Sequence, residues 1–217
     1  MPDISQAIFF LNIQTFIFDL GGVIIDLDEH ATISAFSKMT NVPAPVIFDK
    51  ISNSATFKLY EKGLITDWQF RMEVNNLFES SASDDRIDEA WNAMLGNIPA
   101  ERLELLLELK KDHKVIILSN TNAIHENAFN QILKKASGKD SLTSFADHVF
   151  FSHRLGMRKP DAEIYQEILH QSNTDPTLAL FMDDKQENLN SAESVGIKTM
   201  HISFPDQIFE LKKYVQR

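Results

Sequence analysis

Four short stretches of the chain place a polar or charged side chain directly after an apolar run. The first is FIFDLGG, in which Asp19 closes a run of aromatic and β-branched residues and Gly21 and Gly22 follow it. A carboxylate at such a position can be a nucleophile, a metal ligand, or both. The alternative is an aspartate that only caps a turn. The two glycines would let the backbone turn tightly beside a ligand.

The second and third stretches offer a hydroxyl, an amide and an ammonium group. Ser119 and Asn120 end the run VIILSN, where they either face a phosphate together with backbone N–H groups or form a turn or helix cap. Lys159 precedes Pro160 and an amphipathic segment. Its charge could balance clustered acids and a bound phosphate, and a solvated lysine is the alternative.

The fourth stretch is LALFMDDKQEN, in which Asp183 and Asp184 follow an apolar run. Two adjacent carboxylates at the end of a buried strand are unfavourable unless a cation or a lysine neutralises them. A site rich in oxygen ligands with room for water suits Mg²⁺. Asn188 comes one helical turn after Asp184 and could orient these groups.

The apolar runs predict the elements that must position these side chains. The short runs with the composition of strands buried on both faces are Thr15–Phe18, Val115–Leu118, Val149–Phe151, Leu178–Met182 and Thr199–Ile202. Amphipathic helical patterns, such as those of Ala100–Lys111 and Ala162–His170, lie between them. Strands alternating with helices predict an α/β fold, a Rossmann-like parallel sheet with helices on both faces. Ligands bind at the carboxyl ends of such strands, where the polar side chains fall.

Residues 29–97 have a different character, because helical segments follow one another there without a convincing strand. Thr66 and Gln69, for example, have the spacing of a capping box at a helix start. We therefore expect an all-helical cap domain, 29–97, inserted into a core domain made of residues 1–28 and 98–217.

Composition and charge narrow the classes of partner. The 217 residues are 43% hydrophobic and 24% charged, as is usual for a folded globular protein. A net charge of −10 without a basic stripe argues against a nucleic-acid partner. The chain has no cysteine, which excludes thiolate metal sites and is compatible with a reducing compartment. We expect a cytoplasmic protein with neither a targeting segment nor a membrane span at its N-terminus.

The four stretches together resemble a known family. DLGG at Asp19, LSN at Ser119, RKP at Lys159 and FMDD at residues 183–184 resemble, in order, the four motifs of the haloacid dehalogenase (HAD) superfamily. The helical insertion resembles its C1-type cap in position and size. FDLGGVIID, LSNTN, LGMRKPDAEIY and DDKQEN are most similar to bacterial α-D-glucose-1-phosphate phosphatases and the phosphatase domain of soluble epoxide hydrolase.

This resemblance implies a role for the first and last motifs. Asp19 resembles the family nucleophile, which forms an aspartyl-phosphate. Asp19, the backbone carbonyl of Gly21 and the carboxylate of Asp184 would bind Mg²⁺, with Asp183 adjacent to them.

The resemblance also implies roles for the two middle motifs. Ser119 and Asn120 would hold the transferred phosphoryl group. Lys159 would neutralise charge on that group and on Asp19, and is with Asp19 the implied catalytic pair.

Gly21 departs from the family pattern. HAD phosphatases usually carry a second aspartate two residues after the nucleophile, and it serves as general acid and base. Glycine keeps the backbone carbonyl for the metal but offers no proton to the leaving group, a contribution of about 10²–10⁴-fold. Asp26 and Asp28 could substitute for the missing acid, although turn acids that face water are commoner.

The sequence thus predicts a Mg²⁺-dependent phosphomonoesterase acting on a small phosphorylated metabolite. A sugar phosphate such as a hexose 1-phosphate is favoured because its hemiacetal oxygen is a better leaving group than an ordinary alcohol. A metal-independent 2-haloacid dehalogenase and a non-catalytic protein that binds a phosphorylated ligand are the alternatives. Weaker candidates for substrate contact are Tyr60, Lys62, Trp68 and Trp91, with packing as the alternative role, and His125, with a helix-surface or capping role as the alternative.

Overall fold

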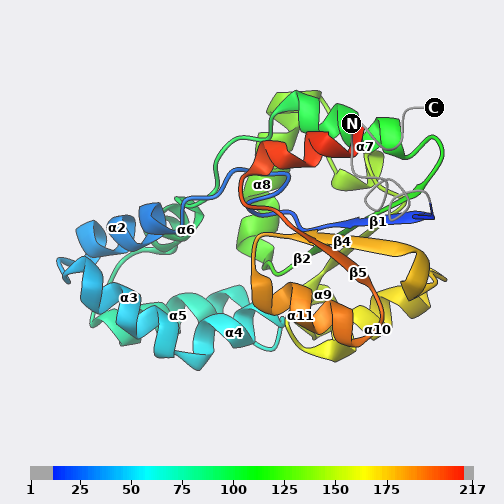
Figure 1. The fold of residues 1–217 in the computed structure, drawn as a ribbon. Helices are drawn as coiled ribbons and strands as arrows, with labels where there is room; N and C mark the ends of the chain where they lie inside the picture. Colours follow the sequence, from blue (N-terminus) through cyan, green and yellow to red (C-terminus); the bar gives the residue numbers. More distant parts are fainter. Residues whose placement is uncertain (1–11, 213–217) are drawn as a thin grey trace.

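A computed structural model describes residues 12–212 of the chain. Its strands form one sheet in the order β3-β2-β1-β4-β5, and all neighbouring strands are parallel (Figure 1). The strands are β1 (Thr15–Phe18), β2 (Lys114–Ser119), β3 (His148–Phe151), β4 (Ala179–Asp183) and β5 (Lys198–His201). The predicted parallel α/β sheet is confirmed, with strand ends shifted by a residue or so. The shift matters at β4, which includes Asp183, whereas Leu178 ends a 3₁₀ turn.

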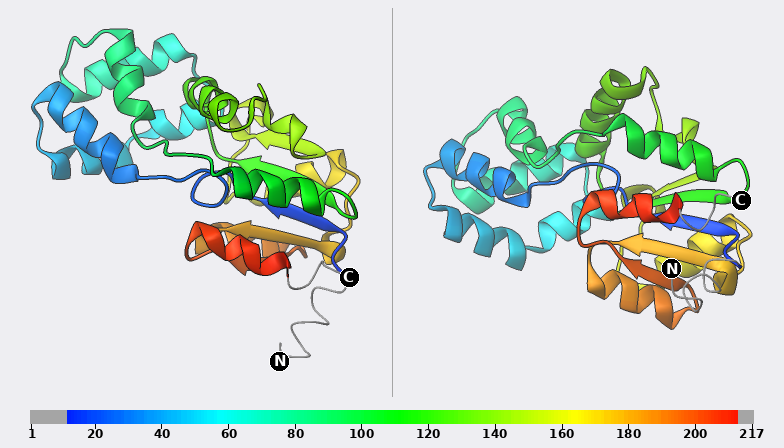
Figure 2. Two further views of the ribbon diagram at one scale, coloured as in Figure 1. Left: turned by 90° about the horizontal axis from the view of Figure 1, so that it is seen from above. Right: turned by 45° about the horizontal axis from the view of Figure 1, so that its top comes forward.

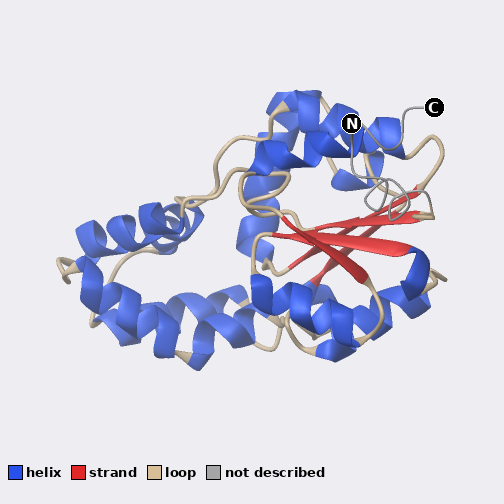
Figure 3. Cartoon of the chain, in the orientation of Figure 1, coloured by secondary structure: helices blue, strands red, loops and turns tan. Residues whose placement is uncertain are grey.

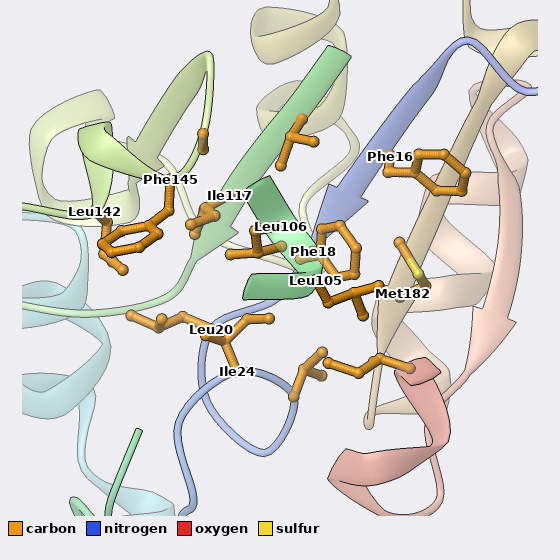
Figure 4. Close-up of a cluster of buried hydrophobic side chains, with 14 of the residues drawn as sticks. Phe16, Phe18, Leu20, Ile24, Leu105, Leu106, Ile117, Leu142, Phe145 and Met182 are labelled. Carbon is orange, nitrogen blue, oxygen red and sulfur yellow. The ribbon is translucent and has the colours of Figure 1, made fainter. Parts of the chain in front are cut away.

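Helices cover both faces of the sheet, as the view by secondary structure shows (Figure 3). The helical segments of the core are α7 (Ala100–Leu109), α8 (Ala123–Ser137), α9 (Ser152–Leu155), α10 (Ala162–Gln171), α11 (Gln186–Ser194) and the 3₁₀ segments Leu142–Ser144, Pro176–Leu178 and Pro205–Leu211. Side chains of successive strand residues point to opposite faces. In β1, Phe16 and Phe18 therefore pack toward α7 (Figure 4), and Ile17 packs on the other face toward α10.

The insertion is all helical, as predicted. It consists of α2 (Glu29–Thr40), α3 (Ala44–Asn53), α4 (Ala55–Glu61), α5 (Asp67–Phe78) and α6 (Asp84–Asn92). These helices share a hydrophobic core around Phe36, Phe70 and Trp91, separate from the two cores that flank the sheet. The capping box at the start of α5 is confirmed, because Thr66 and Gln69 each accept a hydrogen bond from the backbone N–H of the other.

Two connections join the insertion to the sheet, and they run side by side (Figure 2). The N–H of Asp26 donates to the carbonyl of Asn97 at 2.9 Å, and the N–H of Asp28 donates to the carbonyl of Met94 at 2.9 Å. The first helix of the insertion begins at Glu29, where the sequence placed the boundary. The division into 1–28, 29–97 and 98–217 stays a prediction. No helix within residues 12–212 is both long and apolar enough to cross a membrane.

Candidate active site

The sheet brings the polar ends of three adjacent strands together. Asp19 follows β1, Ser119 ends β2 and Asp183 ends β4, and β1 lies between the other two strands. A cavity of about 280 Å³ opens at this edge, between the sheet and the cap. The predicted site residues that line it are Asp19, Gly21, Ser119, Asn120, Lys159 and Asp184. Asp183 is fully buried and contacts this group from behind.

Lys159 is the centre of the charge arrangement. Its Nζ lies 2.8 Å from Asp19 Oδ1 and 2.6 Å from Asp183 Oδ2, and its side chain is 1% exposed. Burial alone would lower the pKa of this lysine, but the two carboxylates outweigh it and the pKa of Lys159 is raised. The ammonium group is therefore a fixed positive charge beside Asp19, and the alternative of a solvated lysine is wrong.

The side chain of Asn120 fixes the backbone of Lys159. Its Oδ1 accepts a hydrogen bond from the N–H of Lys159 at 2.8 Å, and its Nδ2 donates to the carbonyl of Lys159 at 2.9 Å. Both ends of the amide side chain are thus engaged in positioning the lysine. If Asn120 binds a phosphate, as predicted, its backbone N–H and the second N–H of its side-chain amide are the groups that remain to do so.

Asp19 is nearly buried, and its contacts use one oxygen. Oδ1 accepts a hydrogen bond from the N–H of Leu20 at 2.7 Å and pairs with Lys159. Burial raises the pKa of Asp19 to about 7, Lys159 opposes the rise, and the charges of Asp183 and Asp184 add to it. A further cation at this position would favour the ionised form that a nucleophile needs.

Asp183 is held by donors on all sides. Besides Lys159, the side-chain amide of Asn188 donates to both of its oxygens, at 2.9 and 3.0 Å, and the N–H of Lys185 donates to Oδ1 at 2.8 Å. The orienting role predicted for Asn188 is therefore confirmed. These contacts fix Asp183 as the carboxylate that positions Lys159, and its role next to a metal stays a prediction.

The acidic cluster has the features of a cation site. Oxygens of Asp19, Asp183 and Asp184 all lie within 4.8 Å of one another. Asp184 Oδ1 is buried and has no hydrogen-bond partner within the part of the chain that the structure describes. Burial and the neighbouring Asp183 raise the pKa of Asp184, so its charge needs compensation. Carboxylate oxygens are the ligands that Mg²⁺ prefers, and the residues present fit this ion.

The two glycines after Asp19 serve different purposes. Gly22 adopts a left-handed φ of +72°, and a Cβ there would lie 2.8 Å from Asp184 Oδ2. The turn therefore requires a glycine at this position. Gly21 has no such backbone requirement, and a Cβ there would meet only the Leu27 side chain, at 2.3 Å from its Cδ1. Leu27 fills the space into which a second acid would project.

The structure supports neither proposed substitute for that acid. Asp26 pairs with Arg102 at 2.7 Å, and Asp28 caps the first turn of α2. Neither side chain lines the cavity. Glu187, an exposed residue in the first turn of α11, does line the cavity and forms no ion pair within residues 12–212.

His125 lines the cavity, but its ring nitrogens are engaged. Nε2 donates to the carbonyl of Trp91 at 3.1 Å, so Nδ1 is the acceptor for the side-chain amide of Asn122 at 3.2 Å. Burial lowers the pKa of His125 to about 4. The ring also stacks on Trp91, with centroids 4.7 Å apart. His125 is thus a neutral packing residue between α8 and the cap.

The other cap candidates divide between packing and ion pairing. Tyr60 donates to Asp67 at 2.7 Å, Lys62 pairs with Asp161 at 2.7 Å, and Trp68 is 65% exposed. None of the three lines the cavity, whereas Trp91 does.

Sequence reasoning missed several cap residues of the cavity wall, including Phe48 and Glu61. An isolated phenylalanine carries no signal of what its helix faces. Glu61 pairs at 2.9 Å with Arg158.

Comparisons with known proteins place the chain in a family. The sequence model of the haloacid dehalogenase-like hydrolases matches residues 13–196. This match covers most of the chain and includes all four motifs that form the site. The chain belongs to the haloacid dehalogenase-like hydrolase family.

Two of the similar proteins are phosphatases. The chain is 28% identical over 187 residues to a D-ribitol-5-phosphate phosphatase of Bacteroides thetaiotaomicron, covering 86% of this chain and 90% of the relative. It is 25% identical over 208 residues to a glyceraldehyde 3-phosphate phosphatase of Pyrococcus furiosus, covering 88% and 81%. A HAD family enzyme of Bacteroides thetaiotaomicron, solved with magnesium and inorganic phosphate, superimposes with a TM-score of 0.76 at 33% identity, covering 87% of this chain and 93% of that one.

Proposed function

We propose that the protein is a Mg²⁺-dependent phosphomonoesterase that works through an aspartyl-phosphate on Asp19. The observation that carries the proposal is the buried Lys159 ammonium between Asp19 and Asp183, beside an Asp184 oxygen that lacks a partner. The similar phosphatases and the similar enzyme solved with magnesium and phosphate support it. Asp19, the Gly21 carbonyl and Asp184 would hold the ion, which supplies positive charge against the phosphate.

In the proposed reaction, each step has a candidate residue. The known contacts of Asp19 use Oδ1, which leaves Oδ2 to attack phosphorus. As the new P–O bond forms, the ester P–O bond breaks and the leaving group departs with its electron pair. Lys159 and the Ser119 hydroxyl face the phosphoryl oxygens and offset their charge. Water then attacks phosphorus, releasing inorganic phosphate and restoring the Asp19 carboxylate.

The missing acid restricts the leaving group. No side chain at Gly21 can donate a proton, and Leu27 occupies that space. Esters whose leaving oxygen is more acidic than an ordinary alcohol lose least from this absence. Two kinds of ester qualify: an anomeric sugar phosphate such as a hexose 1-phosphate, and a phosphate ester of a phenol. A sugar leaving group needs hydrogen-bonding groups on the cap, whereas a phenol needs an apolar surface there.

The cytoplasmic location stays a prediction.

The test is phosphate release from 4-nitrophenyl phosphate with Mg²⁺, and again after chelation. We expect Asp19→Asn to abolish turnover with the fold intact, because the amide keeps the shape and loses the nucleophile. Asp140→Asn, at an exposed aspartate of the core, is the matched control. Halide release from 2-chloropropionate without metal would instead support the dehalogenase alternative. Phosphate binding without turnover in the presence of Mg²⁺ would support the non-catalytic one.

A further inference from the structure

The cavity has two chemically different ends. The core end carries the charged cluster around Lys159. The cap end is lined by apolar side chains from four helices, α2, α3, α4 and α6, and from the connection after α6: Ile33, Phe48, Ile51, Phe57, Trp91 and Met94. Phe48 is 57% exposed, although it is a large aromatic residue. Because the phosphate of a substrate must lie at the core end, the cap end receives the leaving group.

The polar groups of the cap wall are mostly engaged already. The Thr32 hydroxyl donates to the carbonyl of Trp91 at 3.0 Å and accepts from the N–H of Met94 at 3.1 Å. Glu61 is paired with Arg158, and Glu29 with Lys185 at 3.0 Å. Among the polar cap residues that line the cavity, Ser52 is the one whose side chain has no hydrogen bond within residues 12–212. A leaving group rich in hydroxyls would lose its hydration here with few hydrogen bonds in return.

The apolar surface continues toward the reacting atoms. Leu27 lines the cavity and occupies the space into which a Gly21 side chain would project. The wall that would receive the leaving group and the place of the missing acid are thus one apolar surface. A cavity of about 280 Å³ lies just below the usual range for small-molecule sites, about 300–1,000 Å³. The space suits a phosphate and one ring.

We infer that the substrates are aryl phosphates, the phosphate monoesters of small phenols, whose ring packs between Phe48, Ile51 and Trp91. The inference rests on the proposed phosphomonoesterase function and names its substrate class. As the bond from Asp19 to phosphorus forms, the aryl O–P bond breaks and phenolate leaves, to be protonated by water. A phenol has a pKa of about 10, so the phenolate departs without a general acid. A ring without hydroxyls also loses little hydration at the cap end.

A matched pair of esters separates the polarity of the leaving group from its acidity. 4-Methylphenyl phosphate and 4-(hydroxymethyl)phenyl phosphate release phenols of nearly equal acidity, and differ by one hydroxyl at the far end of the ring. We expect kcat/KM to favour the methyl ester by about tenfold, since the apolar wall cannot replace the hydration of the hydroxyl. Glucose 1-phosphate and ribitol 5-phosphate, measured in the same assay, are expected to be poorer substrates than both.

A variant links this preference to the cap wall. Phe48→Asn is expected to bring the two aryl esters close to equal kcat/KM, because the amide can hydrogen bond to the hydroxymethyl group. Leu64→Asn is the control, since Leu64 is a comparably exposed cap residue, 61% exposed, that does not line the cavity. We expect Leu64→Asn to keep the preference of the unmodified protein.

The outcomes of these experiments distinguish the aryl specificity from the proposed phosphomonoesterase function. Equal rates for the two aryl esters in the unmodified protein, or a higher kcat/KM for either polyol or sugar phosphate, would overturn the aryl specificity and leave the phosphatase proposal standing. A preference that persists in Phe48→Asn would show that the assigned wall does not select the ring. Failure to hydrolyse any phosphate ester in the presence of Mg²⁺ would overturn both.

Discussion

Two lysine–aspartate pairs have nearly the same N–O distance, one within the core and the other between the cap and the core. Lys159 lies 2.6 Å from Asp183 in the core, and Lys62 of the cap lies 2.7 Å from Asp161. Lys159 is 1% exposed, whereas Lys62 is 30% exposed. A buried charge that loses its partner is strongly destabilising, while an exposed pair contributes about 0–1 kcal/mol. Distance alone therefore says little about what an ion pair does.

The two pairs differ in burial, and this difference fits the roles of the core and the cap. The core pair belongs to a network in which Asn120 and Asn188 fix both partners, so the charge is in place before substrate arrives. The cap pair adds weak, solvated ties between the end of α4 and the loop that carries Lys159.

The largest expected effect comes from removing the core lysine. Lys159→Met leaves the buried Asp19 and Asp183 without their cation, and we expect a loss of about 3–5 kcal/mol in the free energy of unfolding. Turnover should also fall by about 10²–10³-fold. Lys62→Met, the matched change in the cap, should cost no more than about 1 kcal/mol. Denaturant unfolding and steady-state rates of both variants measure this, and equal losses in the two would contradict the comparison.

Much of the core end could be predicted from sequence, and the reason is geometric. Asp19, Ser119 and Asp183 end parallel strands, and the carboxyl ends of parallel strands meet at one edge of the sheet. The burial of Lys159 could not be predicted in this way, because it depends on where the loop after α9 returns. Nor could the side-chain clamp of Asn120, whose two hydrogen bonds reach across 39 positions of the chain.

The cap end was less predictable for a different reason. The sequence indicates helices with apolar faces, and most of these faces pack inside the cap itself. Which remaining apolar residue faces the cavity depends on how the whole helical unit is set on the core. Phe48 lines the cavity while the comparably exposed Trp68 does not, although both are aromatic residues on cap helices.

A substitution of Asp184 tests whether the acidic cluster at the core end of the cavity binds a metal ion. Asp184→Asn removes a carboxylate whose Oδ1 is buried without a partner, and it relieves repulsion with Asp183. We expect Mg²⁺ affinity to fall by at least about tenfold, with no loss in the stability of the metal-free protein. Calorimetric titration with Mg²⁺ measures the affinity, with Asp140→Asn as control. Unchanged affinity would remove Asp184 from the ligand set.

Gly21 and Leu27 lie at the boundary between the charged core end and the apolar cap end of the cavity. Gly21→Asp combined with Leu27→Ala supplies an acid and clears the space that its side chain needs. We expect kcat/KM for alkyl phosphates to rise by up to about tenfold, with a smaller change for 4-nitrophenyl phosphate, whose leaving group needs no proton. Leu27→Ala alone is the control for the cleared space. If the single and double variants behave alike, the proton has another source, and Glu187 is then the first residue to change.

The smallest expected effect is at the ties between cap and core. Glu61→Gln with Lys62→Met removes both ion pairs to the loop of Lys159, which are only partly buried. We expect stability to change by no more than about 1 kcal/mol and kcat to stay nearly constant, since neither pair touches the phosphate. At low salt, KM should be a few-fold higher in the double variant than in the unmodified protein. KM of the double variant should no longer depend on ionic strength, because the pairs that salt screens in the unmodified protein are gone. Asp88→Asn, which breaks a pair of the same length within the cap, is the control and should leave the salt dependence of KM in place. A tenfold loss of kcat in the double variant would mean instead that these ties position Lys159 itself, and the cap would then belong to the catalytic arrangement rather than only covering it.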